Sequence, residues 1–77
     1  MWEVIGFEAQ ENDEGQITAY TVYLAKPFKE GQGHGKRCKR YWYRTNEQSY
    51  VPDVGDTVMV ETEVRGKYEV LLDIAAV

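Results

Sequence analysis

The residues best suited to chemistry lie in one stretch, positions 31–44, which reads Gly-Gln-Gly-His-Gly-Lys-Arg-Cys-Lys-Arg-Tyr-Trp-Tyr-Arg. Five of the nine Lys and Arg residues fall within it, and no Asp or Glu occurs between Glu30 and Glu47. Cations interleaved with aromatic rings can hold single-stranded nucleic acid, because the cations contact phosphates and the rings stack on bases. The stretch therefore predicts a binding surface.

Within this stretch, the candidate nucleic-acid or partner-binding residues are His34, Lys36, Arg37, Lys39, Arg40, Tyr41, Tyr43 and Arg44. We expect Arg37 and Lys39 to contact phosphate and Tyr41 and Tyr43 to stack on bases. A structural alternative is open, in which the two tyrosines cover a sheet edge and the cations pair with the protein's own carboxylates.

The overall charge restricts the kind of partner. Acidic residues outnumber basic ones 13 to 9, for a net charge of −4 at pH 7, whereas domains that coat duplex DNA are usually basic. One hypothesis is a local site for single-stranded DNA or RNA. The other is a protein-interaction module, or small inhibitor, that docks its acidic surface on a basic groove of a larger nucleic-acid-handling enzyme. Under either hypothesis a homodimer is conceivable, with the basic strand of one copy beside an acidic strand of another.

Other chemistry has weaker support in the sequence. His34 and Cys38 are the only His and Cys and supply two metal ligands at most, whereas structural zinc needs four. We expect Cys38 to be a buried, inert thiol. The carboxylates are dispersed along the chain, so no pair with a shielded cleft for acid–base work can be identified. The sequence predicts no enzyme activity, metal or cofactor.

Length and composition predict a single small domain. The 77 residues are 43% hydrophobic and 29% charged, which is typical of a folded globular chain. A single Cys excludes an internal disulfide and fits a reducing compartment. We find no apolar run of the roughly 20 residues that cross a membrane and no signal-peptide pattern, so we expect a cytoplasmic protein without membrane contact.

Period-two alternation and turn residues predict the elements that position the binding stretch. Apolar residues do not recur at helical spacing over a useful length, so the domain is predicted to be all-β with five strands. The expected strands are 2–9, 16–25, 36–44, 57–64 and 67–75, with turns at 10–15, 52–56 and 65–66.

Alternation also predicts which side chains face the core. In the 36–44 strand, we expect Cys38 and Trp42 to point inward and Arg37, Lys39, Tyr41 and Tyr43 to share the other face. In the last hairpin, the residues expected to face the core are Val58, Val60, Val64, Tyr68, Val70, Leu72 and Ile74.

The last hairpin also carries a resemblance. Pro52-Asp-Val-Gly-Asp-Thr-Val-Met-Val and Gly66-Lys-Tyr-Glu-Val-Leu-Leu-Asp-Ile are similar to the turn-and-strand pattern of small SH3-like and OB-like barrels. With the glycine-rich loop and the basic strand, the chain resembles short barrel proteins encoded by bacterial phages and mobile elements. This resemblance implies a five-stranded antiparallel barrel, SH3-like or OB-like, that binds its ligand through the middle strands and adjoining loops, here residues 31–44.

Overall fold

The computed structural model describes residues 1–77 and contains five strands and no helix. The strands are β1 Trp2–Glu11, β2 Ile17–Pro27, β3 Lys36–Arg44, β4 Thr57–Arg65 and β5 Tyr68–Ala76. They form one sheet in the order β3-β2-β1-β4-β5, and every pair of neighbours is antiparallel. The prediction of an all-β fold with five antiparallel strands is confirmed. The structure offers no helix with the length and hydrophobicity that a membrane-spanning helix needs.

Local turn chemistry sets where the strands reverse. Between β1 and β2, the side-chain oxygen of Asn12 accepts hydrogen bonds from the backbone N–H groups of Glu14 and Gln16, and Gly15 has a φ of 79°. Between β4 and β5, Arg65 pairs with Tyr68 across a two-residue turn in which Gly66 has a φ of 60°. Asn commonly makes such side-chain turns and Gly adopts positive φ without strain, so both hairpins form where the sequence predicts them.

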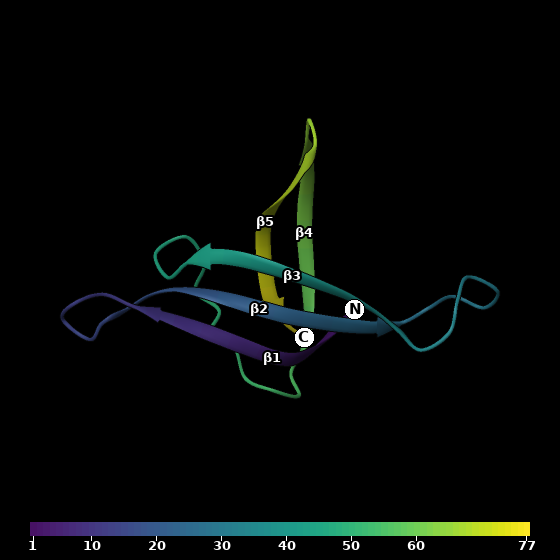
Figure 1. Ribbon diagram of the computed structural model, residues 1–77, viewed down its shortest axis with the longest axis horizontal. Coiled ribbons are helices and arrows are strands. Elements are labelled where there is room, and N and C mark those ends of the chain that lie inside the picture. The colour runs from purple at the N-terminus through teal and green to yellow at the C-terminus, as the bar shows by residue number, and fades with distance from the viewer.

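The sheet does not close into a barrel. β1 pairs with β4 only through Trp2–Val58 and Glu3–Thr57, and the edge strands β3 and β5 share no backbone pairing. Figure 1 shows the consequence: β1, β2 and β3 run together across the view, while the β4–β5 hairpin stands across them and projects beyond them. The molecule is accordingly elongated, with extents of 48 × 31 × 20 Å.

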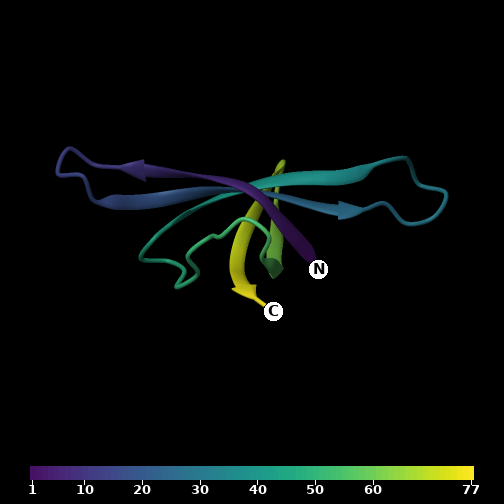
Figure 2. The same ribbon diagram turned by 90° about the horizontal axis from the view of Figure 1, so that it is seen from below.

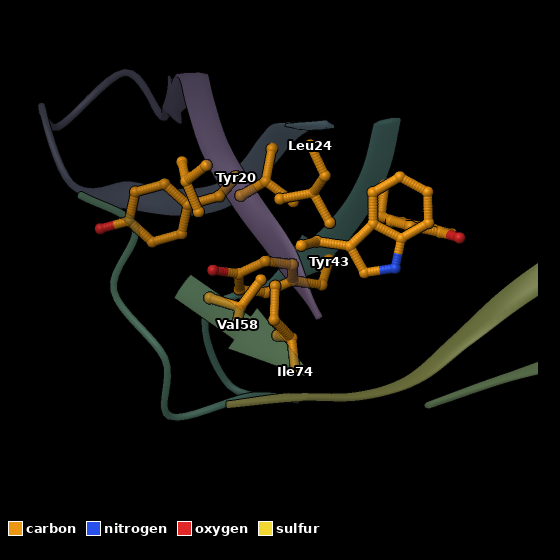
Figure 3. Packing of buried hydrophobic residues seen from close by; sticks show 9 residues of the cluster. Tyr20, Leu24, Tyr43, Val58 and Ile74 are labelled. Carbon is orange, nitrogen blue, oxygen red and sulfur yellow. The ribbon is translucent and has the colours of Figure 1, made fainter. Parts of the chain in front are cut away.

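The hydrophobic core lies where the two parts of the sheet cross. Its nine buried members come from all five strands: Trp2, Val4, Tyr20, Val22, Leu24, Tyr41, Tyr43, Val58 and Ile74. Figure 3 shows Val58 and Ile74 of the hairpin packed beneath Tyr20, Leu24 and Tyr43 of the longer strands. The core therefore joins the hairpin to the rest of the sheet, although few backbone hydrogen bonds do.

A β-bulge changes which side chains of β1 face the core. Val4 lies opposite Leu24 and Gly6 opposite Tyr23, so Ile5 is an extra residue. Before the bulge Trp2 and Val4 are buried, while Ile5 is exposed. The extra residue shifts the alternation, which a strict period-two interpretation of β1 misses.

The predicted inner face of the last hairpin is partly wrong. Val58 and Ile74 are buried and Val60 is partly buried, as predicted, but Val64 and Tyr68 are 72% and 76% exposed. Leu72 is also exposed, because a register shift pairs Thr62 with Leu71 and Glu61 with Asp73, and Leu71 packs against the core instead. The tip of the hairpin projects past the other strands, so Val64 and Tyr68 have no neighbouring side chains that could cover them.

Candidate nucleic-acid interface

The structure reverses the predicted faces of β3, although its bounds agree with the predicted 36–44. Tyr41 and Tyr43 are buried in the core at 8% and 2% exposure, whereas Trp42 is 47% exposed and Cys38 is exposed. The expectation that Trp42 and Cys38 point inward was wrong, as was the expectation of a buried thiol. Tyr41 and Tyr43 therefore cannot stack on bases in this structure.

The two cations that share the tyrosine face are engaged within the protein. The Arg37 guanidinium lies 5.9 Å from the centre of the Trp2 ring, over which Lys26 also lies at 4.4 Å. Lys39 Nζ is 3.0 Å from Oε1 of Glu69 on β5. This part of β3 agrees with the structural alternative, in which tyrosines pack and cations find partners in the protein. Arg37 and Lys39 are thus less suited to phosphate contact than the sequence suggests.

The opposite side of the β1–β2–β3 layer, which we call the outer face, is largely uncovered. Figure 2 shows the 45–56 loop and most of the β4–β5 hairpin below this layer, and only the far end of the hairpin rises past it. Residues opposite one another in an antiparallel pair share a face, so the register assigns side chains to the outer face. Tyr23 lies opposite Arg40, Thr21 opposite Trp42, and Ala19 opposite Arg44.

Trp42 has its ring held in place on this face. Its Nε1–H donates to Oε1 of Gln10 on β1 at 3.2 Å, and the Arg44 guanidinium lies 5.7 Å from the ring centre. Arg44 follows Trp42 by two positions and Arg40 precedes it by two, so a cation flanks the ring on either side along the strand. An exposed indole with one guanidinium against it and a second arginine two residues away is suited to base stacking.

Tyr23 supplies a second, partly exposed ring. Its hydroxyl donates to Oε1 of Glu8 at 2.6 Å, and this hydrogen bond raises the pKa of Tyr23, while the neighbouring Arg40 acts in the opposite direction. Tyr23 thus remains a neutral phenol. Glu8 lies opposite Thr21, so Glu8, Thr21 and Trp42 form one row across three strands.

Two hollows adjoin these rings. The first, which we call the Thr21 hollow, has a volume of about 370 Å³ and is lined by Glu8, Thr21, Tyr23, Arg40, Tyr41 and Trp42. The second, the Ile5 hollow, has a volume of about 250 Å³ and is lined by Ile5, Tyr23, Leu24, Cys38, Lys39 and Arg40. They share Tyr23 and Arg40, so the outer face carries two adjacent depressions with one ring and one guanidinium common to both.

The cations of the outer face form a line along β3. Lys36, Arg40 and Arg44 all point away from the core and are exposed. They recur every four residues, which places them about 13 Å apart on an extended strand. His34 is exposed in the loop before β3. Of the residues predicted from the sequence, these four are exposed, whereas Arg37 and Lys39 are partly buried.

Sequence reasoning missed Glu8, Gln10 and Tyr23, which lie on β1 and β2 rather than in the basic stretch. It also misassigned Trp42, because the largest ring was expected inside. A signal was present: the even-numbered face of residues 36–44 holds three of the five cations and only one ring, whereas the other face offers two rings for burial. The face with more charge stays in water because burying charged groups is costly.

The candidate site contains no cluster of metal ligands. No group of three or more His, Cys, Asp or Glu side chains gathers around a common point anywhere in the structure. The candidate site consists of aromatic rings, guanidinium groups and one carboxylate on the outer face of the sheet. Comparison with protein-family models, with curated proteins and with solved structures finds no match to this chain.

Proposed function

We propose that this domain is a non-enzymatic module that binds single-stranded DNA or RNA in the cytoplasm through its outer face. Trp42 and Tyr23 stack on bases, while Lys36, Arg40 and Arg44 contact phosphates. One observation supports this function above the others: on a largely uncovered sheet face (Figure 2), the half-exposed Trp42 ring has the Arg44 guanidinium 5.7 Å from its centre and Arg40 two residues before it.

The direct test is a titration of the protein with labelled single-stranded oligonucleotides at several salt concentrations. Replacing Trp42 with Ala should weaken binding by about 1 to 3 kcal/mol with the salt dependence unchanged, because a stacking contact is lost. Replacing Arg40 and Arg44 together should instead reduce the slope of log K against log salt by about 1.4, since each phosphate contact on a single strand contributes about 0.7.

Matched controls are available on the hairpin, away from the outer face. Tyr68→Ala removes an exposed ring, and Arg65→Ala with Lys67→Ala removes two exposed charges. None of these changes should alter affinity or slope by a comparable amount. Wild-type protein that binds no single-stranded oligonucleotide at low salt would overturn the proposed function.

A second candidate function has its own supporting observation. The β4–β5 hairpin projects from the body with Val64 and Tyr68 exposed, and its Glu61 and Glu63 are exposed as well. Exposed apolar groups beside like charges are typical of a protein-interaction surface, here one suited to a basic groove. Salt-dependent binding to a purified basic nucleic-acid-handling protein, together with no affinity for oligonucleotides, would favour this function.

We also infer a relationship to the small SH3-like or OB-like barrels of phages and mobile elements, in an opened form. The edges of β3 and β5 face each other through Lys39, Tyr41 and Glu69, as they would in a barrel lacking its closing hydrogen bonds. An experimental structure in which β3 and β5 lie on opposite sides of the molecule would contradict this inference.

A further inference from the structure

The outer face holds one hydrogen-bonding group that stacking and phosphate contact leave unused. Glu8 accepts the Tyr23 hydroxyl through Oε1, while its Oε2 has no hydrogen-bond partner within the protein. The Glu8 side chain is exposed, and it lines a hollow together with Tyr23, Arg40 and Trp42. A carboxylate in this position repels phosphates, but its free oxygen can accept a hydrogen bond from a base.

The Thr21 hollow places that carboxylate beside the stacking rings. Glu8 lines it from β1, Thr21 and Tyr23 from β2, and Arg40 and Trp42 from β3. A base stacked on Trp42 or Tyr23 would have the cation of Arg40 at the β3 end and the acceptor of Glu8 at the β1 end. The sugar–phosphate backbone is drawn toward the cationic end, which turns the hydrogen-bonding edge of the base toward Glu8.

The chemistry of a carboxylate determines which bases can donate a hydrogen bond to it. A carboxylate is an acceptor only, and acidic side chains accept readily from the N4 amino group of cytosine. Adenine and guanine also carry exocyclic amino groups. Uracil and thymine present a carbonyl oxygen at C4, where cytosine has its amino group, and an unpaired carboxylate oxygen repels it. Their only ring donor on this edge, N3–H, lies between two carbonyl oxygens, so a carboxylate that approaches it meets repulsion from both sides.

Building on the proposed nucleic-acid binding, we propose that Glu8 is a specificity-determining residue that favours bases with an exocyclic amino group over uracil and thymine. Tyr23 holds the carboxylate in position through its hydroxyl, and the free oxygen receives the amino N–H of the base. The domain is therefore selective for base chemistry at one position of a single strand.

The sharpest test uses two labelled ligands, a 12-nucleotide oligo-deoxycytidine and a 12-nucleotide oligo-deoxyuridine, at pH 7.5 and fixed salt. Their bases differ only in the amino or carbonyl group at C4 and in the proton on N3. Wild-type protein should bind the cytidine strand about fivefold more tightly, as expected for one additional hydrogen bond. Glu8→Gln should bring the ratio of the two affinities close to one, because an amide can also donate to the uracil carbonyl.

The ratio is the readout because removing any negative charge strengthens binding to both strands. Glu11→Gln, which removes a charge at the end of β1 outside the Thr21 hollow, should raise both affinities and keep the wild-type ratio. Thermal melting checks that both variants are folded. Equal binding of the two strands by wild type, or an unchanged ratio in Glu8→Gln, overturns the role of Glu8 while the proposed function stands. Binding of neither strand overturns the proposed function itself.

Discussion

The hydroxyl of Tyr41 on β3 donates a hydrogen bond to Oε1 of Glu69 on β5, at 2.5 Å, across a gap where the two strands share no backbone pairing. The same oxygen lies 3.0 Å from Nζ of Lys39. One carboxylate therefore receives a neutral and a charged donor from alternate residues of the opposite edge. The gap between β3 and β5 is bridged by side chains alone.

This contact predicts how stability depends on pH. The hydrogen bond from Tyr41, followed by that from Lys39, lowers the pKa of Glu69. A carboxyl group with a lowered folded-state pKa stabilises the protein above its unfolded value of about 4.3, and the contribution is lost as pH falls through the folded value. Tyr41→Phe should reduce the melting temperature at pH 7, and the deficit relative to wild type should shrink at pH 3.

Tyr68→Phe is the matched control for that experiment, since it removes the same hydroxyl from an exposed residue of β5. Its melting temperature should follow wild type at both pH values. A deficit in Tyr41→Phe of equal size at pH 7 and pH 3 would show that the ionisation of Glu69 is not coupled to this hydrogen bond.

Val58 fixes the hairpin to the sheet, and its truncation should measure that attachment. The side chain is fully buried, so Val58→Ala should lower the free energy of unfolding by about 2 kcal/mol through lost transfer energy and the cavity left behind. Val64→Ala, the same change at an exposed position of β4, should cost no more than about 0.5 kcal/mol. Urea denaturation of the two variants provides the comparison, and equal losses would mean that the hairpin packs differently.

Gly55 lies in the turn that precedes β4 and has a φ of 97°. Its N–H donates to the carbonyl oxygen of Val4 at 2.9 Å, so this position also anchors the turn to β1. Gly55→Ala should destabilise the fold by about 1 to 2 kcal/mol, because a side chain disfavours the left-handed region. Gly6→Ala is the control: its φ is not positive, and the added Cβ would meet Tyr23 Cδ2 at 3.9 Å, an ordinary contact. Chemical denaturation should therefore show no loss for Gly6→Ala.

Cys38 should react as an accessible thiol. It is exposed on the outer face and lines the Ile5 hollow beside Arg40. Maleimide should label the folded protein fully without denaturant, as followed by intact mass. An attached maleimide occupies the hollow, so the labelled protein should bind oligonucleotides more weakly than the unlabelled protein. If Cys38 instead resists labelling until the protein unfolds, the thiol is buried, as expected from the sequence.

The bounds of β3 were predictable, whereas its orientation was not. Glycines before Lys36 and polar residues after Arg44 limit the strand on both sides. Alternation divides its residues into two sets but does not say which set faces the core. That choice depends on the total surface that each set can bury: two tyrosines against one tryptophan, with three cations on the tryptophan side. Tertiary packing selected the tyrosines.

One bulge explains the error at Leu72 in the predicted core, and another determines which residues of β1 are buried. Ile5 and Leu72 are each an extra residue opposite a continuous partner strand. A single inserted residue moves all later side chains to the other face, and no pattern in apolar and polar residues marks it reliably. Whether the sheet closes into a barrel could not be predicted from local sequence either, because closure depends on how far β1 continues beside β4 after Glu3.

The narrow junction between β1 and β4 has a consequence for how the chain opens and closes. Two residue pairs join the hairpin to the other strands, so the β4–β5 ribbon can fray from its tip without disturbing β1, β2 and β3. A two-stranded ribbon is only marginally stable by itself, and its outer half has little to pack against. Amide protons near Val64 should therefore exchange with solvent through local opening, whereas those of Val22 and Leu24 exchange only when the whole domain unfolds. We therefore expect the tip of the hairpin to open separately from the rest of the sheet, which the buried side chains of Val58 and Ile74 hold together.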